Sequence, residues 1–248
     1  MFLRRTREET SRELPEVNKI VHTIDYDEAA VAKVDDLARK LAMTVMTGSF
    51  VERGQAAREL DLRVRHATGV SKARYVAEYV KMFLENGESV LLAGWHRDVY
   101  DIWLKELEAY RPCMYTGSES PTEKDEAKKR FISGESKVMF ISLRSGIGLD
   151  GLQEKASIIV FGELDWSPMV HEQVIGRLHR DGQANQVTSI YLVSDSGSDP
   201  VMVDLLGLKA SQAKDVVDPL LGPSKQYTDE SRIKRLAESY LNRSSDGA

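Results

Sequence analysis

Two short runs in the middle of the chain restrict its possible folds more than any other feature. They are VMFIS, within residues 137–143, and IIVF, within residues 157–161, and both are apolar almost throughout. A strand that is apolar on both faces has to be covered on both faces, as it is in a parallel sheet. Similar runs occur at 89–93, 112–115 and 187–193, with stretches of helical periodicity between them. This alternation predicts a doubly wound α/β domain.

Apolar residues at helical spacing fill most of the remaining chain. They predict helices over residues 26–46, 54–62, 71–84, 98–110, 120–132, 198–217 and 229–241. Residues 1–20 are polar and are expected to be extended, and the last few residues read as a disordered tail. A change of pattern after Gly69 predicts three units. These are a helical extension at 1–68, the α/β domain at 69–195, and C-terminal helices with the tail at 196–248.

The composition is that of a globular protein in a reducing compartment. The 248 residues include one cysteine, Cys113, which rules out an internal disulfide and a multi-cysteine zinc site. The net charge of −5 gives no overall basic surface, so any nucleic-acid binding has to come from a local patch. No apolar run approaches the roughly 20 residues of a membrane span, and the N-terminus lacks the apolar core of a secretory signal. We therefore expect a cytoplasmic protein, associated with the nucleoid if bacterial, with no membrane partner.

Residues 163–183, ELDWSPMVHEQVIGRLHRDGQ, read as a loop followed by an amphipathic helix. Ser167 can cap this helix, Pro168 suits its first turn, and Gly182 can end it. Apolar residues recur at every fourth position and form the face that anchors the helix. That face consists of Val170, Val174 and Leu178.

The polar face of the same helix carries Gln173, Arg177 and Arg180. The forked guanidinium of arginine suits phosphate, although such a face, taken alone, is more often plain solvated surface. The chain has no G-x-x-x-x-G-K-[ST] motif, and its acidic stretch 25–30 is better explained as the start of a helix than as a magnesium box. With no phosphate loop in the chain to serve, the arginines fit an arginine finger directed at another lobe. We expect this face to be exposed to solvent.

The loops after the strands are the other candidate sites, because ligands of open parallel sheets bind beyond the carboxyl ends of the strands. Four loops are expected there, at residues 94–96, 116–118, 142–153 and 163–168. The third, SLRSGIGLDGLQ, is rich in glycine, so its backbone can approach a ligand, although a simple glycine turn also explains the pattern. No convincing general base stands at these strand ends, which disfavours an enzyme that acts on a small phosphorylated molecule.

Together these segments resemble the second RecA-like lobe of superfamily 2 helicases, specifically of the Swi/Snf-type DNA translocases. The resemblance covers residues 1–215, and its most specific block is Gln173-x-x-x-Arg177-x-x-Arg180-x-Gly182-Gln183, which is similar to the family's sixth motif. The other similar segments are 142–152, 89–96, Tyr115-Thr-Gly-Ser, Asp165-Trp-Ser-Pro and the join between the lobes at 2–15. The resemblance implies a RecA-like fold that lacks the phosphate loop.

The resemblance also implies a role for each matching residue. Arg177 and Arg180 would be catalytic fingers that reach the γ-phosphate of ATP on the first lobe, and Gln173 and Gln183 would support that interface. Two further residues on the nucleotide side are Gly148 and Asp150, the second an aspartate where many relatives carry asparagine and a candidate to hold the ribose. The implied contacts to the DNA backbone are Ser142, Gly146, Gly117 and Ser118. No residue is implied as a metal ligand.

ATP and Mg²⁺ are the cofactors that the resemblance implies, bound mainly by a first RecA-like lobe that this sequence does not contain. The implied partners are that lobe and DNA, in duplex form, held through its phosphates. Because the sequence starts at the join between the lobes, we expect an excised C-terminal half that hydrolyses no ATP alone. The alternative is a non-catalytic RecA-like module that binds DNA or protein, which the joint retention of Gln173, Arg177, Arg180 and Gln183 disfavours.

Overall fold

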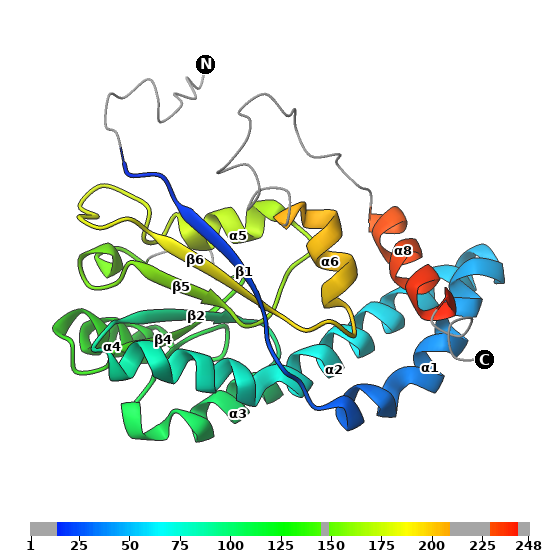
Figure 1. Cartoon of the computed structure of the whole chain (residues 1–248), viewed down its shortest axis with the longest axis horizontal. Coiled ribbons are helices and arrows are strands. Elements are labelled where there is room, and N and C mark those ends of the chain that lie inside the picture. The colour runs from blue at the N-terminus through cyan, green and yellow to red at the C-terminus, as the bar shows by residue number, and fades with distance from the viewer. Residues whose placement is uncertain (1–13, 145–148, 209–228, 243–248) are drawn as a thin grey trace, which may run out of the picture.

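Parallel strands form a single sheet of six within the described part of the chain (Figure 1). The computed structural model describes residues 14–144, 149–208 and 229–242. The strands are β1 (Asn18–Thr23), β2 (Val90–Gly94), β3 (Cys113–Tyr115), β4 (Val138–Ser142), β5 (Ile158–Phe161) and β6 (Thr188–Val193). Their spatial order is β1-β6-β5-β2-β4-β3, and all neighbouring pairs run parallel. The predicted doubly wound parallel sheet is therefore confirmed.

Helices cover both faces of the sheet, because consecutive side chains of a strand point to opposite sides. They are α1 (Glu28–Thr47), α2 (Phe50–Glu85), α3 (Arg97–Glu106), α4 (Pro121–Ser133), α5 (Pro168–Ile175), α6 (Asp199–Leu206) and α8 (Asp229–Asn242), with short 3₁₀ turns η2 (Glu108–Tyr110) and η3 (Leu152–Glu154). Val90 and Leu92 of β2 pack with α3 and the C-terminal half of α2. Leu91 and Ala93 lie in the core shared with α4, α5 and α6.

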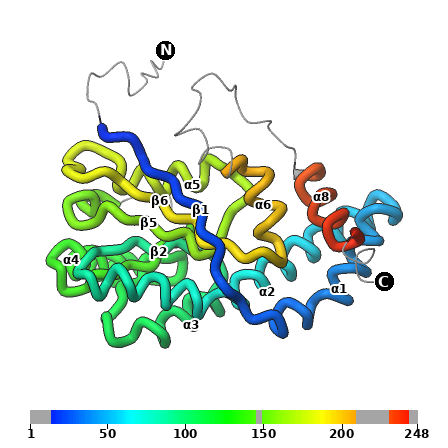
Figure 2. The backbone as a smooth tube through the Cα atoms, in the orientation of Figure 1, coloured from blue at the N-terminus to red at the C-terminus, as the bar shows by residue number. Residues whose placement is uncertain are grey.

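An arm of three helices projects beside the sheet (Figure 2). It consists of α1, the N-terminal half of α2, and α8, and α1 packs against both of the others. The core of the arm is continuous with one side of the sheet, and includes the buried Ala42, Leu60, Val64 and Leu236. Within the described ranges, no helix is both long enough and apolar enough to cross a membrane.

Helix α2 runs for 36 residues without a break, whereas the sequence predicted two helices that separate before Gly69. That prediction was wrong because Gly69 does not end a helix. It lies inside α2, at a position where neighbouring side chains approach the backbone closely. A Cβ at Gly69 would overlap the Glu163 carboxylate and lie 3.0 Å from the side chain of Val99. The boundary proposed after residue 68 falls inside this helix, and the division into units stays a prediction.

Strand β1 was not among the predicted strands. It lies at the edge of the sheet and pairs in parallel with β6. Its sequence, NKIVHT, mixes polar and apolar residues, because an edge strand is covered incompletely. The acidic stretch that follows starts α1, since Asp27 Oδ1 accepts hydrogen bonds from the amides of Ala29 (3.0 Å) and Ala30 (3.2 Å). This cap supports the interpretation of that stretch as a helix start.

The remaining predicted helices begin close to the expected residues. The capping box before α4 is present, because the amide of Ser120 donates to Glu123 Oε2 at 2.8 Å and Ser120 Oγ accepts from the amide of Glu123. Helix α6 begins at Asp199 but ends at Leu206 with Gly207 as its left-handed cap, so the single helix predicted over 198–217 is interrupted there. Residues 1–13, 209–217 and 243–248 lie outside the described residues.

Candidate functional site

The arginine-bearing segment after β5 is a short helix followed by tight turns. Helix α5 ends at Ile175 with Gly176 as its cap, so the predicted extension to Gly182 was wrong. Glycine is unfavourable inside a helix. Beyond it, the backbone amides bond mostly to carbonyls two to four residues back, and no regular helix continues. Arg177 and Arg180 therefore lie on folded turns rather than on one face of a helix.

The buried side chain of Gln183 holds these turns from the inside. Its Nε2 donates to the carbonyl oxygen of Ala156 at 2.9 Å, and its Oε1 accepts from the amide of Asn185 at 2.9 Å. An amide that makes these bonds faces the protein interior. Gln173, in contrast, is exposed on α5. The two glutamines that the resemblance assigns to one interface thus lie in different surroundings.

An ion pair joins Arg180 to Asp150, between its Nη1 and the Oδ1 of the carboxylate. The two side chains are 36% and 71% exposed, so both remain accessible to solvent. A second contact links the same segments, because Gln153 Nε2 donates to the carbonyl oxygen of Asp181 at 3.2 Å. Arg177, on the same turns, is half-buried. The expected exposure of the arginine face is thus only partly realised.

The carboxylate of Glu163 holds the two residues that follow the carboxyl end of β2. Glu163 itself is only 4% exposed. Its Oε2 accepts from the amides of Trp95 (2.6 Å) and His96 (2.9 Å), and its Oε1 lies 2.5 Å from His96 Nδ1. Burial raises the pKa of Glu163, but the hydrogen bond and charge of His96, with the two amides, lower it further, so the pKa lies below its ordinary value. The sequence analysis did not single out Glu163. The available signal was a carboxylate two residues after the end of an apolar strand.

Arg144 covers the carboxyl end of β4. Its Nε and Nη2 donate to Asp165 Oδ2 at 3.1 and 3.0 Å, and its guanidinium lies 5.2 Å from the centre of the Trp95 ring. The hydroxyl of Ser142, a predicted DNA contact, accepts from the amide of Arg144 at 3.3 Å. This edge of the sheet therefore carries the Ser142 hydroxyl and, two residues on, a guanidinium that Asp165 holds, and both are groups that bind phosphate.

The turn after β3 holds two more predicted DNA contacts, Gly117 and Ser118, both exposed. Glu119 fixes this turn, because its Oε2 accepts from the amide of Thr116 at 2.5 Å and its Oε1 from the Thr116 hydroxyl at 2.9 Å. The backbone of the turn is thus held in place next to the carboxyl edge of the sheet.

The predicted site residues fall into two sets. Arg180 and Asp150 meet at the turns after α5, and the predicted DNA contacts lie after β3 and at the end of β4. The sequence places Gly146 and Gly148 between the two sets, and both lie outside the described residues. Within the part that is described, no group of three or more His, Cys, Asp or Glu side chains is placed to hold a metal ion.

Two histidines near α5 have structural partners. Nε2 of the buried His171 accepts from the amide of Asp165 at 3.3 Å, and its ring lies 5.0 Å from that of Phe161. Burial lowers the pKa of His171 to about 4. Nε2 of His179 lies 2.9 Å from the carbonyl oxygen of Pro15, in the segment before β1. This contact joins the turns after α5 to the segment before β1.

Comparison with known proteins gives a matching family for the centre of the chain. Residues 71–182 match the family described as the helicase conserved C-terminal domain. The SWI/SNF-related matrix-associated actin-dependent regulator of chromatin subfamily A-like protein 1 of Drosophila melanogaster is 28% identical over 215 residues, which cover 83% of this chain and 27% of that protein. The DNA annealing helicase and endonuclease ZRANB3 of Homo sapiens is 28% identical over 226 residues, covering 85% and 20%. The chain therefore spans about a quarter of the length of such relatives.

Solved structures with the same fold include the Sulfolobus solfataricus SWI2/SNF2 ATPase C-terminal domain. Its TM-score is 0.63 at 16% identity, covering 92% of this chain and 97% of that one. The Sulfolobus solfataricus SWI2/SNF2 ATPase core in complex with dsDNA has a TM-score of 0.66 at 18% identity, covering 82% and 46%. The all-parallel sheet with helices on both faces therefore has the RecA-like fold of these C-terminal domains. The part of the chain at residues 71–182 is thus similar to a helicase C-terminal domain, and the relatives that it resembles are SWI/SNF-related proteins.

Proposed function

We propose that this chain is the second motor lobe of an ATP-dependent DNA translocase, with Arg177 and Arg180 as arginine fingers for ATP on the first lobe. The ion pair between Arg180 and Asp150 carries this proposal. It supports the view that Arg180 presents its guanidinium where an anionic oxygen can bind. Because the same fork of donors binds carboxylate and phosphate, the Asp150 carboxylate stands in for a phosphate oxygen.

The proposed contribution of this lobe to catalysis is electrostatic stabilisation of the transition state. When bound, ATP supplies the phosphoryl group that passes to water, and Mg²⁺ neutralises part of its charge. Arg180 exchanges the Asp150 carboxylate for the charge that develops in the transition state, and Arg177 adds a second positive charge from the same turns. Because such charges stabilise the transition state more than the ground state, they raise the turnover rate. Gln183 contributes indirectly, since its inward hydrogen bonds keep the turns rigid.

The contacts to DNA lie at the carboxyl edge of the sheet. Ser142 offers a hydroxyl, and the turn at Gly117 and Ser118 offers exposed backbone, which are groups that bind phosphates without reading base sequence. The solved dsDNA complex of a protein with the same fold supports a duplex as the substrate. When the fingers engage, this lobe moves toward the first lobe with its DNA contacts, and release of the fingers resets it. Repeated closure gives movement along the DNA backbone.

The finger assignment is tested in the longer protein that joins this chain to a first lobe. Arg177→Ala and Arg180→Ala should each reduce DNA-stimulated ATPase turnover by at least about 10³-fold, as loss of a finger does in GTPases. Binding of duplex DNA, followed by fluorescence anisotropy, should be largely kept. Arg63→Ala is the matched control, because Arg63 is an exposed arginine of α2 whose partner is Glu59. Near-normal turnover in both finger variants would contradict the proposal.

A second assay separates the motor lobe from the non-catalytic alternative. The purified chain alone should hydrolyse no ATP, and a separately produced first lobe should gain DNA-stimulated activity when the chain is added. The Arg180→Ala chain should fail to give this gain. If the intact chain and its variant behave alike in the mixture, the chain is a binding module rather than half of a motor.

A further inference from the structure

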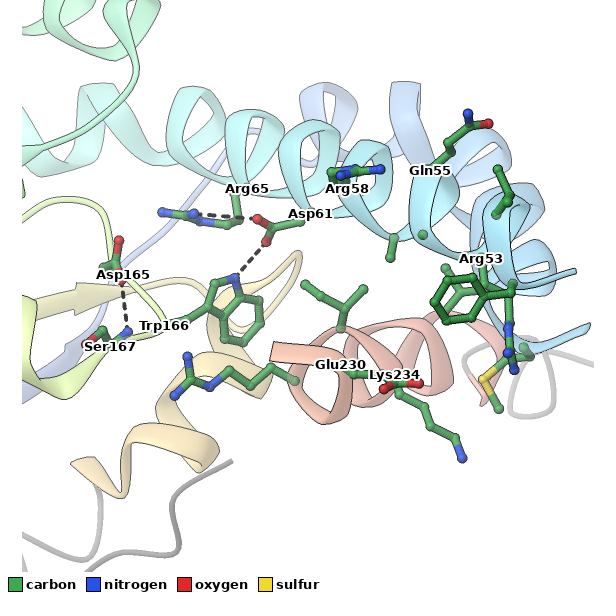
Figure 3. Close-up of a pocket in the computed structure, with 18 of the residues that line it drawn as sticks. Arg53, Gln55, Arg58, Asp61, Arg65, Asp165, Trp166, Ser167, Glu230 and Lys234 are labelled. Carbon is green, nitrogen blue, oxygen red and sulfur yellow. Dashed lines mark hydrogen bonds and ion pairs between the residues drawn. The ribbon is translucent and has the colours of Figure 1, made fainter. Parts of the chain in front are cut away.

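A cleft of about 1070 Å³ lies between the arm and the carboxyl edge of the sheet (Figure 3). Its walls come from the N-terminal part of α2, from α8, and from the loop after β5. Positively charged residues line it from α2, from α8 and from the position after β4, and they outnumber the acidic ones, which are Asp61, Asp165 and Glu230. The positively charged residues are Arg53, Arg58, Arg65, Arg144, Arg232 and Lys234. The cleft is therefore basic in a protein whose net charge is −5.

Two of these cations are already engaged. Arg65 donates to the carbonyl oxygen of Leu164 at 2.9 Å and pairs with Asp61, and Arg144 donates to Asp165. Those interactions also use two of the three carboxylates of the cleft, so neither is left to neutralise the remaining cations.

Arg53, Arg58 and Lys234 have no ion pair within the ranges that the structure describes. All three side chains are exposed, and they come from both helices of the cleft. Positive charges in this arrangement attract an anionic ligand with several charges, and the attraction weakens as salt rises.

An exposed aromatic ring lies beside these cations. Phe50 is 84% exposed although it lines the cleft, and the adjacent Val51 is 66% exposed. A phenylalanine on this surface does not contribute to the core of the arm. Free cations next to an accessible aromatic face are the combination with which proteins hold unpaired nucleotides, the cations at the phosphates and the ring against a base.

We propose that this cleft binds single-stranded nucleic acid, with phosphates at Arg53, Arg58 and Lys234 and a base stacked on Phe50. A duplex is a poorer match, because its base faces are stacked on one another and offer none to Phe50. An acidic peptide matches the charges but leaves the ring unused. The site adjoins Ser142 through Arg144, but none of the arginine fingers, Gly117 or Ser118 lines it, and its proposed ligand contacts at Arg53, Arg58, Lys234 and Phe50 take no part in the proposed ATPase.

The test is fluorescence anisotropy with the purified chain and a fluorescein-labelled oligothymidylate of about 12 nucleotides, within the usual site size of such grooves. We expect single strands to bind at least about tenfold more tightly than a duplex of equal length, with an affinity that falls steeply with salt. Phe50→Ala should weaken binding by about tenfold. The double variant Arg53→Ala/Arg58→Ala should weaken binding of the oligonucleotide by at least tenfold. It should also reduce the slope of log affinity against log salt concentration by the amount expected for two lost phosphate contacts.

The matched control is Arg39→Ala/Arg63→Ala, which removes two exposed positive charges from the same arm but from outside the cleft. Binding in this control should stay close to that of the unchanged chain. Equal loss in the two double variants would overturn the proposal, as would preference for the duplex or no binding of the oligonucleotide. Equally tight binding of a polyglutamate peptide would assign the cleft to an acidic protein instead. None of these results bears on the finger residues, whose test is the ATPase assay.

Discussion

The indole nitrogen of Trp166 donates a hydrogen bond of 2.7 Å to Asp61 Oδ1, across 105 residues of sequence. This bond ties the loop after β5 to the arm, and Arg65 reinforces it from α2 by reaching the carbonyl oxygen of Leu164. The loop that leads to the arginine-bearing turns is therefore fixed to the arm as well as to the sheet.

Asp61→Ala should lower the free energy of unfolding by about 1–3 kcal/mol, because it leaves a largely buried indole N–H without its acceptor. Asp61→Asn keeps an acceptor and should lose clearly less. Urea denaturation followed by tryptophan fluorescence measures both. If the alanine and asparagine variants are equally stable, the hydrogen bond to Trp166 contributes nothing measurable.

Two glycines of α2 should respond to alanine with opposite signs. At Gly54 nothing lies within 4 Å of an added Cβ, so Gly54→Ala should raise the free energy of unfolding by about 0.5–1 kcal/mol through helix propensity. At Gly69 the added Cβ would meet Glu163, whose carboxylate is fixed by its bonds to Trp95 and His96. Gly69→Ala should therefore lower it by about 1–3 kcal/mol. Thermal denaturation of the two variants side by side checks this, and a stabilising Gly69→Ala would contradict the packing at that position.

The stability of the chain should fall as the pH drops from about 6.5 toward 4, through His171. Its pKa is lowered to about 4 by burial, so over this window the unfolded chain binds a proton that the folded chain does not. The contribution is fully present above pH 6.5 and is lost as the pH falls, up to about 3 kcal/mol in all. Urea unfolding of the unchanged chain and of His171→Gln at several pH values measures it. The variant should show a shallower loss in this window, and identical pH dependence would exclude His171 as the cause.

Asp150→Ala should leave ATPase turnover of the longer protein within about fivefold, because an exposed ion pair is worth at most about 1 kcal/mol. Arg180→Ala should be far more damaging, so comparison of the two variants separates the finger from its carboxylate partner. A raised KM for ATP with kcat unchanged would support the ribose contact that the resemblance implies for Asp150. A large loss of kcat in Asp150→Ala would instead show that this carboxylate positions the finger.

The sheet could be predicted from the sequence because strands buried on both faces leave an unambiguous apolar run, such as IIVF at β5. The edge strand β1 could not be predicted in this way. It is only partly covered by other elements, so its sequence mixes polar and apolar residues and leaves no apolar run. The end of α5 was missed because the apolar spacing continues past Gly176, and Leu178 is still buried although the backbone has left the helix. The spacing of apolar residues indicates which side chains are buried, and here the buried positions continue beyond the end of the helix.

The candidate site was predictable residue by residue but not as a set of contacts. Arg180 and Asp150 were each identified through motif resemblance, but their ion pair depends on how two distant turns meet in space. Gln183 was assigned to the nucleotide interface, and its inward hydrogen bonds follow from tertiary packing that no spacing reveals. Glu163 was missed because a single carboxylate after a strand forms no recognisable sequence motif. Its role becomes visible only when the fold brings it to the amides of Trp95 and His96 at the end of the neighbouring strand.

The unbroken path of α2 has a mechanical consequence. At 36 residues it is a rod about 54 Å long, with its C-terminal half clamped against the sheet and its other half in the arm. The free half from Gly69 to Phe50 is about 28 Å long, so a tilt of about 10° at Gly69 displaces the far end by about 5 Å. Small adjustments of the strand-end loops around Gly69 are thereby enlarged at Phe50. The tip of the arm is consequently the place where a fluorescent reporter would register the proposed closing and opening of the lobe most sensitively.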